Sequence, residues 1–118
     1  MTRSQRLDAT FAALADSTRR AILARLVLGG ASVAELAKPF AMSQPAVSKH
    51  LKVLEHAGLI STAQDAQRRP RKIEGVRLGE ATAWLGEYRQ FWERRYSALD
   101  ALLGQLQAKP PQPKRKRR

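Results

Sequence analysis

Apolar residues recur at helical spacing in the first part of the chain. They predict one helix over about residues 4–14 and a second over about residues 18–28. The apolar positions are Leu7, Phe11 and Leu14 in the first helix, and Ile22, Leu23 and Leu26 in the second. Asp16 or Ser17 is expected to cap the second helix, and Gly29-Gly30 to end it. Two amphipathic helices therefore precede residue 31.

The next segment predicts a short helix, a turn and a longer helix. Ser32 and Glu35 have capping-box spacing and open a helix that ends near Lys38, before Pro39. Ser43 is expected to cap a helix over about residues 44–57, with Pro45 tolerated in its first turn and Gly58 at its end. Its apolar face holds Val47, Leu51 and Leu54. This order is a helix-turn-helix.

The polar positions of the longer helix indicate DNA recognition. Gln44, Ser48, Lys49 and Lys52 lie off the apolar face, and their short polar or basic groups suit base edges and phosphates. Ser43 is more suited to capping than to base reading, and the helix N-terminus that it shares with Pro45 could hold a phosphate. The alternative is an amphipathic packing helix with a polar solvent face.

Residues 59–78 predict a β-hairpin. Strands are expected at 59–63 and 72–78, joined by a polar, basic tip. The cations that we assign to DNA contact there are Arg68, Arg69 and Arg71. A merely solvated loop is the alternative. The hairpin would be the wing of a winged helix, which gives a mostly α fold with a small β-hairpin.

One long helix is predicted from Gly79 to Gln107. Leu85, Trp92, Leu99 and Leu106 recur every seven residues, and the stripe is too broad for a small domain to cover. We interpret it as a dimer interface, with plain core and a ligand pocket as alternatives. The predicted interface residues are Leu7, Phe11, Leu85, Tyr88, Trp92, Tyr96, Leu99, Leu102, Leu103 and Leu106. The homodimer would form through the first and last helices.

Charge and length set the organisation of the chain. The net charge is +12: residues 1–79 carry +7, residues 80–108 carry −1 and residues 109–118 carry +6. We expect a DNA-binding and dimerisation domain over residues 1–108 and a disordered basic tail over residues 109–118. A basic domain of this kind indicates nucleic acid as its partner.

No apolar run predicts a membrane span or a signal peptide, so we expect a cytoplasmic, nucleoid-associated protein.

The candidate chemistry does not favour an enzyme or a metal centre. The chain has no cysteine, and its two histidines, His50 and His56, lie six positions apart on one helix. His50 is expected to be a half-buried histidine bonded to the backbone rather than a metal ligand. Arg19 and Arg20 either pair with an acid such as Asp16 or reach the DNA backbone. We predict no cofactor and no catalytic residue.

Three segments resemble the ArsR/SmtB-type bacterial transcriptional repressors. Residues 11–23 (FAALADSTRRAIL) resemble the family's opening, residues 43–51 with 54–60 its recognition helix, and residues 84–93 the last helix of a branch without metal ligands. The order is right over roughly residues 8–106. Metal-sensing members carry cysteines at the positions of Ser32 and Ala34, so the resemblance implies no metal sensing here.

The resemblance implies a homodimeric winged helix that binds an inverted-repeat operator in double-stranded DNA and represses its own operon. It places DNA contacts at Gln44, Pro45, Ser48 and Lys49 and in the wing. A non-specific architectural DNA binder and a protein-interaction module remain as alternatives. The sequence identifies no effector.

Overall fold

The computed structural model describes residues 1–63 and 69–107. The chain divides into two compact units, Met1–Ala83 and Trp84–Arg118. The predicted basic tail lies outside the described residues, and the predicted single domain over residues 1–108 stays a prediction. Among the described residues, no helix combines the length and the apolar character needed to cross a bilayer.

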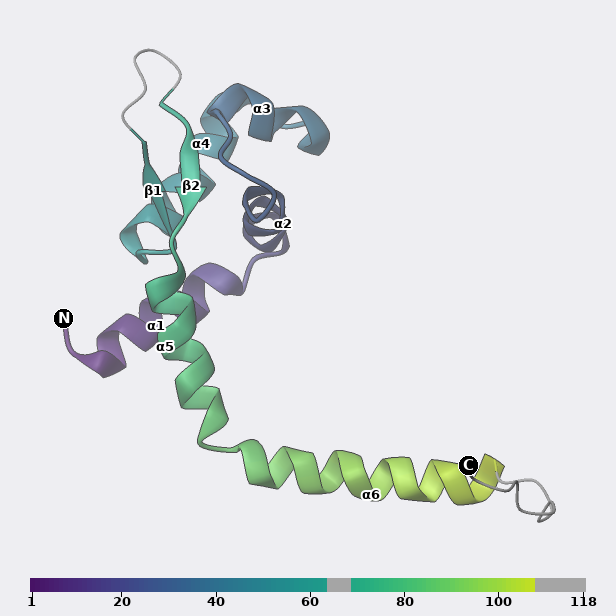
Figure 1. Cartoon of the computed structure of the whole chain (residues 1–118). Helices are drawn as coiled ribbons and strands as arrows, with labels where there is room; N and C mark the ends of the chain where they lie inside the picture. The colour runs from purple at the N-terminus through teal and green to yellow at the C-terminus, as the bar shows by residue number, and fades with distance from the viewer. Residues whose placement is uncertain (64–68, 108–118) are drawn as a thin grey trace, which may run out of the picture. The chain divides into compact units, whose positions relative to one another are not determined.

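Two capped helices open the first unit, as the sequence predicts (Figure 1). Helix α1 spans Arg3–Leu14 and α2 spans Ser17–Leu26. Asp16 is the N-cap of α2, because its carboxylate accepts a hydrogen bond from the Arg19 amide at 3.0 Å. The turn between the helices is therefore fixed by a side chain that the sequence places there.

The predicted helix-turn-helix is present. Helix α3 (Val33–Ala37) has the Ser32–Glu35 capping box and runs into a 3₁₀ turn, η1 (Lys38–Phe40). Helix α4 (Gln44–His56) begins at its N-cap Ser43. Gly58 follows with a φ of 75°, where a side chain would be strained and would press on Arg77. The glycine thus lets the chain turn into the hairpin.

The hairpin is confirmed, but its second strand is shorter than predicted. Strand β1 (Ile60–Thr62) pairs antiparallel with β2 (Arg71–Ile73). Arg71 also exchanges backbone hydrogen bonds of 2.8 and 3.0 Å with Ala31, so the segment before α3 extends the sheet. The predicted strand through Leu78 is wrong, because helix α5 (Gly75–Gly86) already begins at Gly75.

The predicted single long helix is also wrong. Helix α5 ends at Gly86, and a separate helix, α6, spans Arg89–Gln107. The amides of Glu87 and Tyr88 bond to carbonyls only three residues back, at 3.1 and 3.0 Å, which tightens and ends the last turn. The seven-residue repeat therefore does not run along one helix: Leu85 belongs to α5 and the later members to α6.

The core of the first unit lies under α4. Val47, Leu51 and Leu54, the predicted apolar face, are buried, and they belong to one cluster with Ile22, Leu26 and Leu36, among others. The opposite face of α4 stays outside this core. A second contact ties α1 to α5 within the same unit, where the Arg6 guanidinium donates to both oxygens of Glu80 at 2.7–3.1 Å. That pairing lowers the pKa of Glu80.

Candidate nucleic-acid interface

The outward side of α4 carries the predicted DNA-contacting residues. Gln44, Ser48 and Lys52 follow one another at four-residue spacing, so they form one row along the helix. Gln44 and Lys52 are exposed, whereas Ser48 is half-buried at the edge of the core. Pro45 and Lys49 are exposed on the adjoining row. The structure therefore brings these five predicted residues together on one helix.

The N-terminal end of this helix is open to an anion. Ser43 is exposed, and its hydroxyl accepts a hydrogen bond from the Ala46 amide at 3.2 Å. This occupies the hydroxyl in capping, as expected, rather than in contact with a partner. Pro45 has no N–H, and the Val47 amide donates to the Ser43 carbonyl at 3.1 Å, so the Gln44 amide and the positive end of the helix dipole remain at this end.

The exposed charge of α4 is positive. Lys49 and Lys52 are exposed, while Glu55, the acid of this helix, is half-buried and accepts a hydrogen bond from the Thr62 hydroxyl at 2.8 Å. The carboxylate is thereby turned toward the hairpin. Because no acid competes on the outward side of α4, this face suits a phosphate backbone.

The wing residues have different environments. Arg69 is exposed and has a φ of 44°, in the left-handed region. Arg71 is half-buried, and its guanidinium donates to the Arg69 carbonyl at 2.9 Å. Arg68 lies outside the described residues. Of the two wing arginines that the structure describes, Arg69 is the one that extends into solvent.

Arg19 joins the end of α1 to α4. Its guanidinium donates to the carbonyls of Ala13 and Ala12, at 2.7 and 3.1 Å, and lies 3.3 Å from Nδ1 of His50. The Asp16 carboxylate is 3.8 Å from the same ring nitrogen. The hydrogen bond from the Arg19 amide lowers the pKa of Asp16, with the nearby Arg19 and His50 charges acting in the same direction.

These contacts give the surroundings of Arg19, Arg20 and His50 in the single chain. Arg19 and Arg20 both donate hydrogen bonds to carbonyls of α1. The Arg20 guanidinium donates to the Leu14 carbonyl at 2.7 Å. The two guanidinium groups donate to carbonyls in the last turn of α1, where the Ala12 carbonyl also accepts from the Ala15 amide at 3.2 Å. His50 is half-buried, as expected, but its partners are the side chains of Arg19 and Asp16 and not the backbone.

Comparison with known proteins identifies the chain. A family model described as a helix-turn-helix domain matches residues 14–63. The HTH-type transcriptional regulator Rv2034 of Mycobacterium tuberculosis is 38% identical over 96 residues, which are 81% of this chain and 87% of that protein. The crystal structure of the ArsR family transcriptional regulator RHA00566 matches with a TM-score of 0.69 and 44% identity, over 76% of this chain and 93% of that one. This protein belongs to the ArsR family.

A second curated relative extends the comparison. The transcriptional repressor SdpR of Bacillus subtilis is 30% identical over 79 residues, which are 67% of this chain and 88% of that protein. The chain is thus a DNA-binding transcriptional regulator with a winged helix-turn-helix fold. Within residues 1–63 and 69–107, no three His, Cys, Asp or Glu side chains gather closely enough to hold a metal ion.

The Arg19 contacts join residues whose proximity the sequence does not show. The sequence did contain one signal for these contacts. The last carbonyls of a helix lack helical partners, and Arg19 and Arg20 lie in the first turn of the next helix, where a cation can donate to such carbonyls. The sequence does not show that α4 would lie beside Arg19. His50 therefore connects α4 to the α1–α2 turn through a contact between residues far apart in sequence.

Replacing Arg19 by methionine is expected to destabilise the protein by roughly 1–3 kcal/mol. The methionine keeps an apolar stem but removes the donors to Ala12 and Ala13 and the contact with His50. Urea denaturation measures the change. Arg20→Met is the matched control, because exposed Arg20 donates to the Leu14 carbonyl only, and it should lose less. Equal losses in the two variants would show that Arg19 has no special role in joining the helices.

Proposed function

We propose that this regulator binds an inverted-repeat operator as a homodimer and represses transcription, including that of its own operon. The outward face of α4 carries the proposal: a capped N-terminus followed by a polar and basic row from which the helix's acid is turned away. A helix with these properties can place its first residues against base edges in the major groove.

In this arrangement Gln44 reads a base edge, with Ser48 and Lys49 beside it. Gln44 is exposed in the first turn, and its amide can both donate and accept, as adenine requires. Lys52 holds a phosphate, and Ser43 and Pro45 bring the helix N-terminus to the backbone. In the wing, Arg69 and Arg68 contact phosphates or the minor groove, and Arg71 supports Arg69 through its carbonyl.

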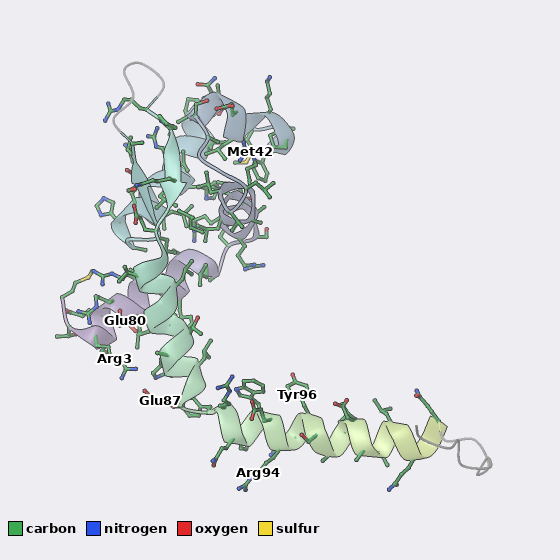
Figure 2. All side chains as sticks on the ribbon, viewed as in Figure 1. Arg3, Met42, Glu80, Glu87, Arg94 and Tyr96 are labelled. Atoms are coloured by element: carbon green, nitrogen blue, oxygen red, sulfur yellow. The ribbon has the colours of Figure 1, made fainter. Side chains whose placement is uncertain are left out.

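The exposed face of α6 supports the homodimer. Trp92, Tyr96, Leu99, Leu103 and Leu106 alternate at four- and three-residue spacing, which is the heptad pattern of paired helices. No described residue of α6 is buried, and Trp92, Leu99 and Leu103 are 41%, 47% and 41% exposed. Tyr96 and Arg94 lie on opposite sides of the helix (Figure 2). An apolar stripe of this length is expected to be covered by a partner. The proposed interface also includes Leu7, Phe11, Leu85, Tyr88 and Leu102.

Selection of bound duplexes from a random pool tests the proposal. The full chain at about 0.15 M salt, where surface charges act over roughly 8 Å, should recover an inverted repeat. Its half-sites should lie roughly 10–10.5 base pairs apart, centre to centre, or a multiple of that. Gln44→Ala should lose preference at one position in each half-site, worth roughly 1–3 kcal/mol per base pair.

Lys52→Ala is the matched variant, two turns further along the same row as Gln44. Because a phosphate contact carries no sequence information, it should weaken selected and random duplexes alike and reduce the salt slope by about one. A featureless pool bound by the unaltered chain would contradict the proposal in favour of an architectural DNA binder. Equal losses on both kinds of duplex for Gln44→Ala would contradict its base-reading role.

A further inference from the structure

An apolar groove lies between α1 and the C-terminal half of α4. Ala9 and Ala12 of α1 line it together with Val53 of α4 and Ala57, the C-cap of that helix, and Met1 lies at the border. The open volume is about 380 Å³. The small alanine side chains leave this space between the helices, and Val53 remains 40% exposed on its wall. Such an alanine-lined groove offers room and apolar surface to an alkyl chain.

The rim of the groove carries one cationic side chain and one imidazole side chain of α4. Lys52 and His56 both line it, and they lie one turn apart on the same side of the helix. Both are exposed, and neither forms an ion pair in the part of the chain that the structure describes. The neighbouring acid, Glu55, is held by Thr62. The charge at the rim is therefore available to an anion.

We propose that this groove binds an aliphatic carboxylate. The alkyl chain lies on the floor between Ala9, Ala12 and Ala57, and the carboxylate lies at the rim between Lys52 and His56. Apolar burial supplies most of the affinity, and the cation sets the preference for an anionic head. A neutral apolar ligand or a second copy of the protein would match the floor but would leave the positive rim without a partner.

The location links such a ligand to DNA release. Gln44, Ser48, Lys52 and His56 form one row along α4, so the ligand engages the end of the row that we propose to face DNA. A carboxylate paired with Lys52 occupies the cation otherwise available to a phosphate. By linkage, ligand and DNA then lower each other's affinity by the same factor. This regulatory step rests on the proposed function, whereas ligand binding itself does not.

Calorimetric titration of the DNA-free full chain with hexanoate, octanoate and decanoate, below their micellar concentrations, tests the site. Affinity should rise roughly twofold per added methylene, half the effect of full burial, because the groove is open on one side. The methyl NMR signals of Ala9, Ala12 and Ala57 should shift on binding. 1-Octanol should bind more weakly than octanoate in the unaltered chain, and His56→Gln should reduce that difference.

Ala12→Leu fills the groove and should abolish octanoate binding. Ala24→Leu, the same change at an exposed position of α2, should leave binding unaltered. Both variants should retain the DNA affinity of the unaltered chain, so a loss confined to the ligand separates the groove from the fold. Absent binding, or binding insensitive to Ala12→Leu, overturns the proposal.

The DNA arm of the experiment separates this inference from the proposed function. Octanoate should lower the affinity of the unaltered chain for its selected duplex and should not affect Ala12→Leu. If octanoate binds without weakening DNA binding, the regulatory link is overturned. If the ligand-free chain selects no duplex at all, the proposed function is wrong. The calorimetric titration then still tests whether the groove binds an aliphatic carboxylate.

Discussion

Replacing Leu99 by aspartate is expected to separate the protein into monomers and to lower its affinity for an inverted-repeat operator by roughly 100-fold or more. Leu99 lies near the middle of the apolar stripe of α6 and is 47% exposed in the single chain. In a symmetric dimer the substitution places a carboxylate in the interface twice, and burying a charge without a partner is costly. Each protomer then binds one half-site by itself, without the gain in affinity that a linked second protomer provides.

Sedimentation equilibrium gives the oligomeric state, and fluorescence anisotropy with a labelled operator gives the affinity. Ser97→Asp is the matched control, because it introduces the same residue on the opposite side of α6, about 160° around the helix. It should leave the dimer and its DNA affinity unchanged. A Leu99→Asp protein that remains dimeric would show that α6 is not the interface.

The helix-turn-helix could be predicted from the sequence because its determinants are local. Each of these helices begins at a side chain that accepts a hydrogen bond from the backbone amide three residues ahead. These side chains belong to Ser32, Ser43 and Asp16, so a short stretch of sequence determines each helix start. Gly58 takes the positive φ that ends α4. The buried face of α4 follows from spacing alone, since a helix with apolar residues on one side must bury that side.

The segment after the hairpin could not be predicted in the same way. Val76 and Leu78 continue the alternation of a strand, yet both lie in α5. The hairpin closes where the Glu74 amide donates to the Leu59 carbonyl at 2.8 Å, and one turn into the helix Glu80 meets Arg6 of α1. Both are contacts between residues far apart in sequence, which override local β-propensity.

The break between α5 and α6 had only a weak signal in the sequence. Gly86 lowers helix propensity by about 1 kcal/mol relative to alanine, which a helix usually tolerates. The candidate site was also only partly predictable. Helical spacing predicts that Gln44 and Lys52 share a face of α4. The hydrogen bond that holds Glu55 to Thr62 depends on where the hairpin packs. Local chemistry thus predicts which residues α4 presents, and tertiary contacts decide the charge beside them.

Replacing Leu54 by alanine is expected to lower the free energy of unfolding by roughly 2–5 kcal/mol. The Leu54 side chain is 0% exposed and lies in the core cluster beneath α4. Truncation removes apolar burial and leaves a cavity that the surrounding helices fill only partly. Because domains of this kind are stable by about 5–15 kcal/mol in total, the loss is a large share of the stability.

Urea denaturation measures this loss, and Leu28→Ala is the control. Leu28 is 82% exposed, so the same chemical change should cost less than about 0.5 kcal/mol. The comparison also separates the two faces of α4. The Leu54→Ala protein should lose DNA binding only in proportion to the fraction that is unfolded. The Gln44→Ala protein should lose base preference while its free energy of unfolding stays unchanged. If Leu54→Ala cost no more than Leu28→Ala, α4 would not be held by its apolar face, and the orientation of the proposed base-reading row would lose its physical basis.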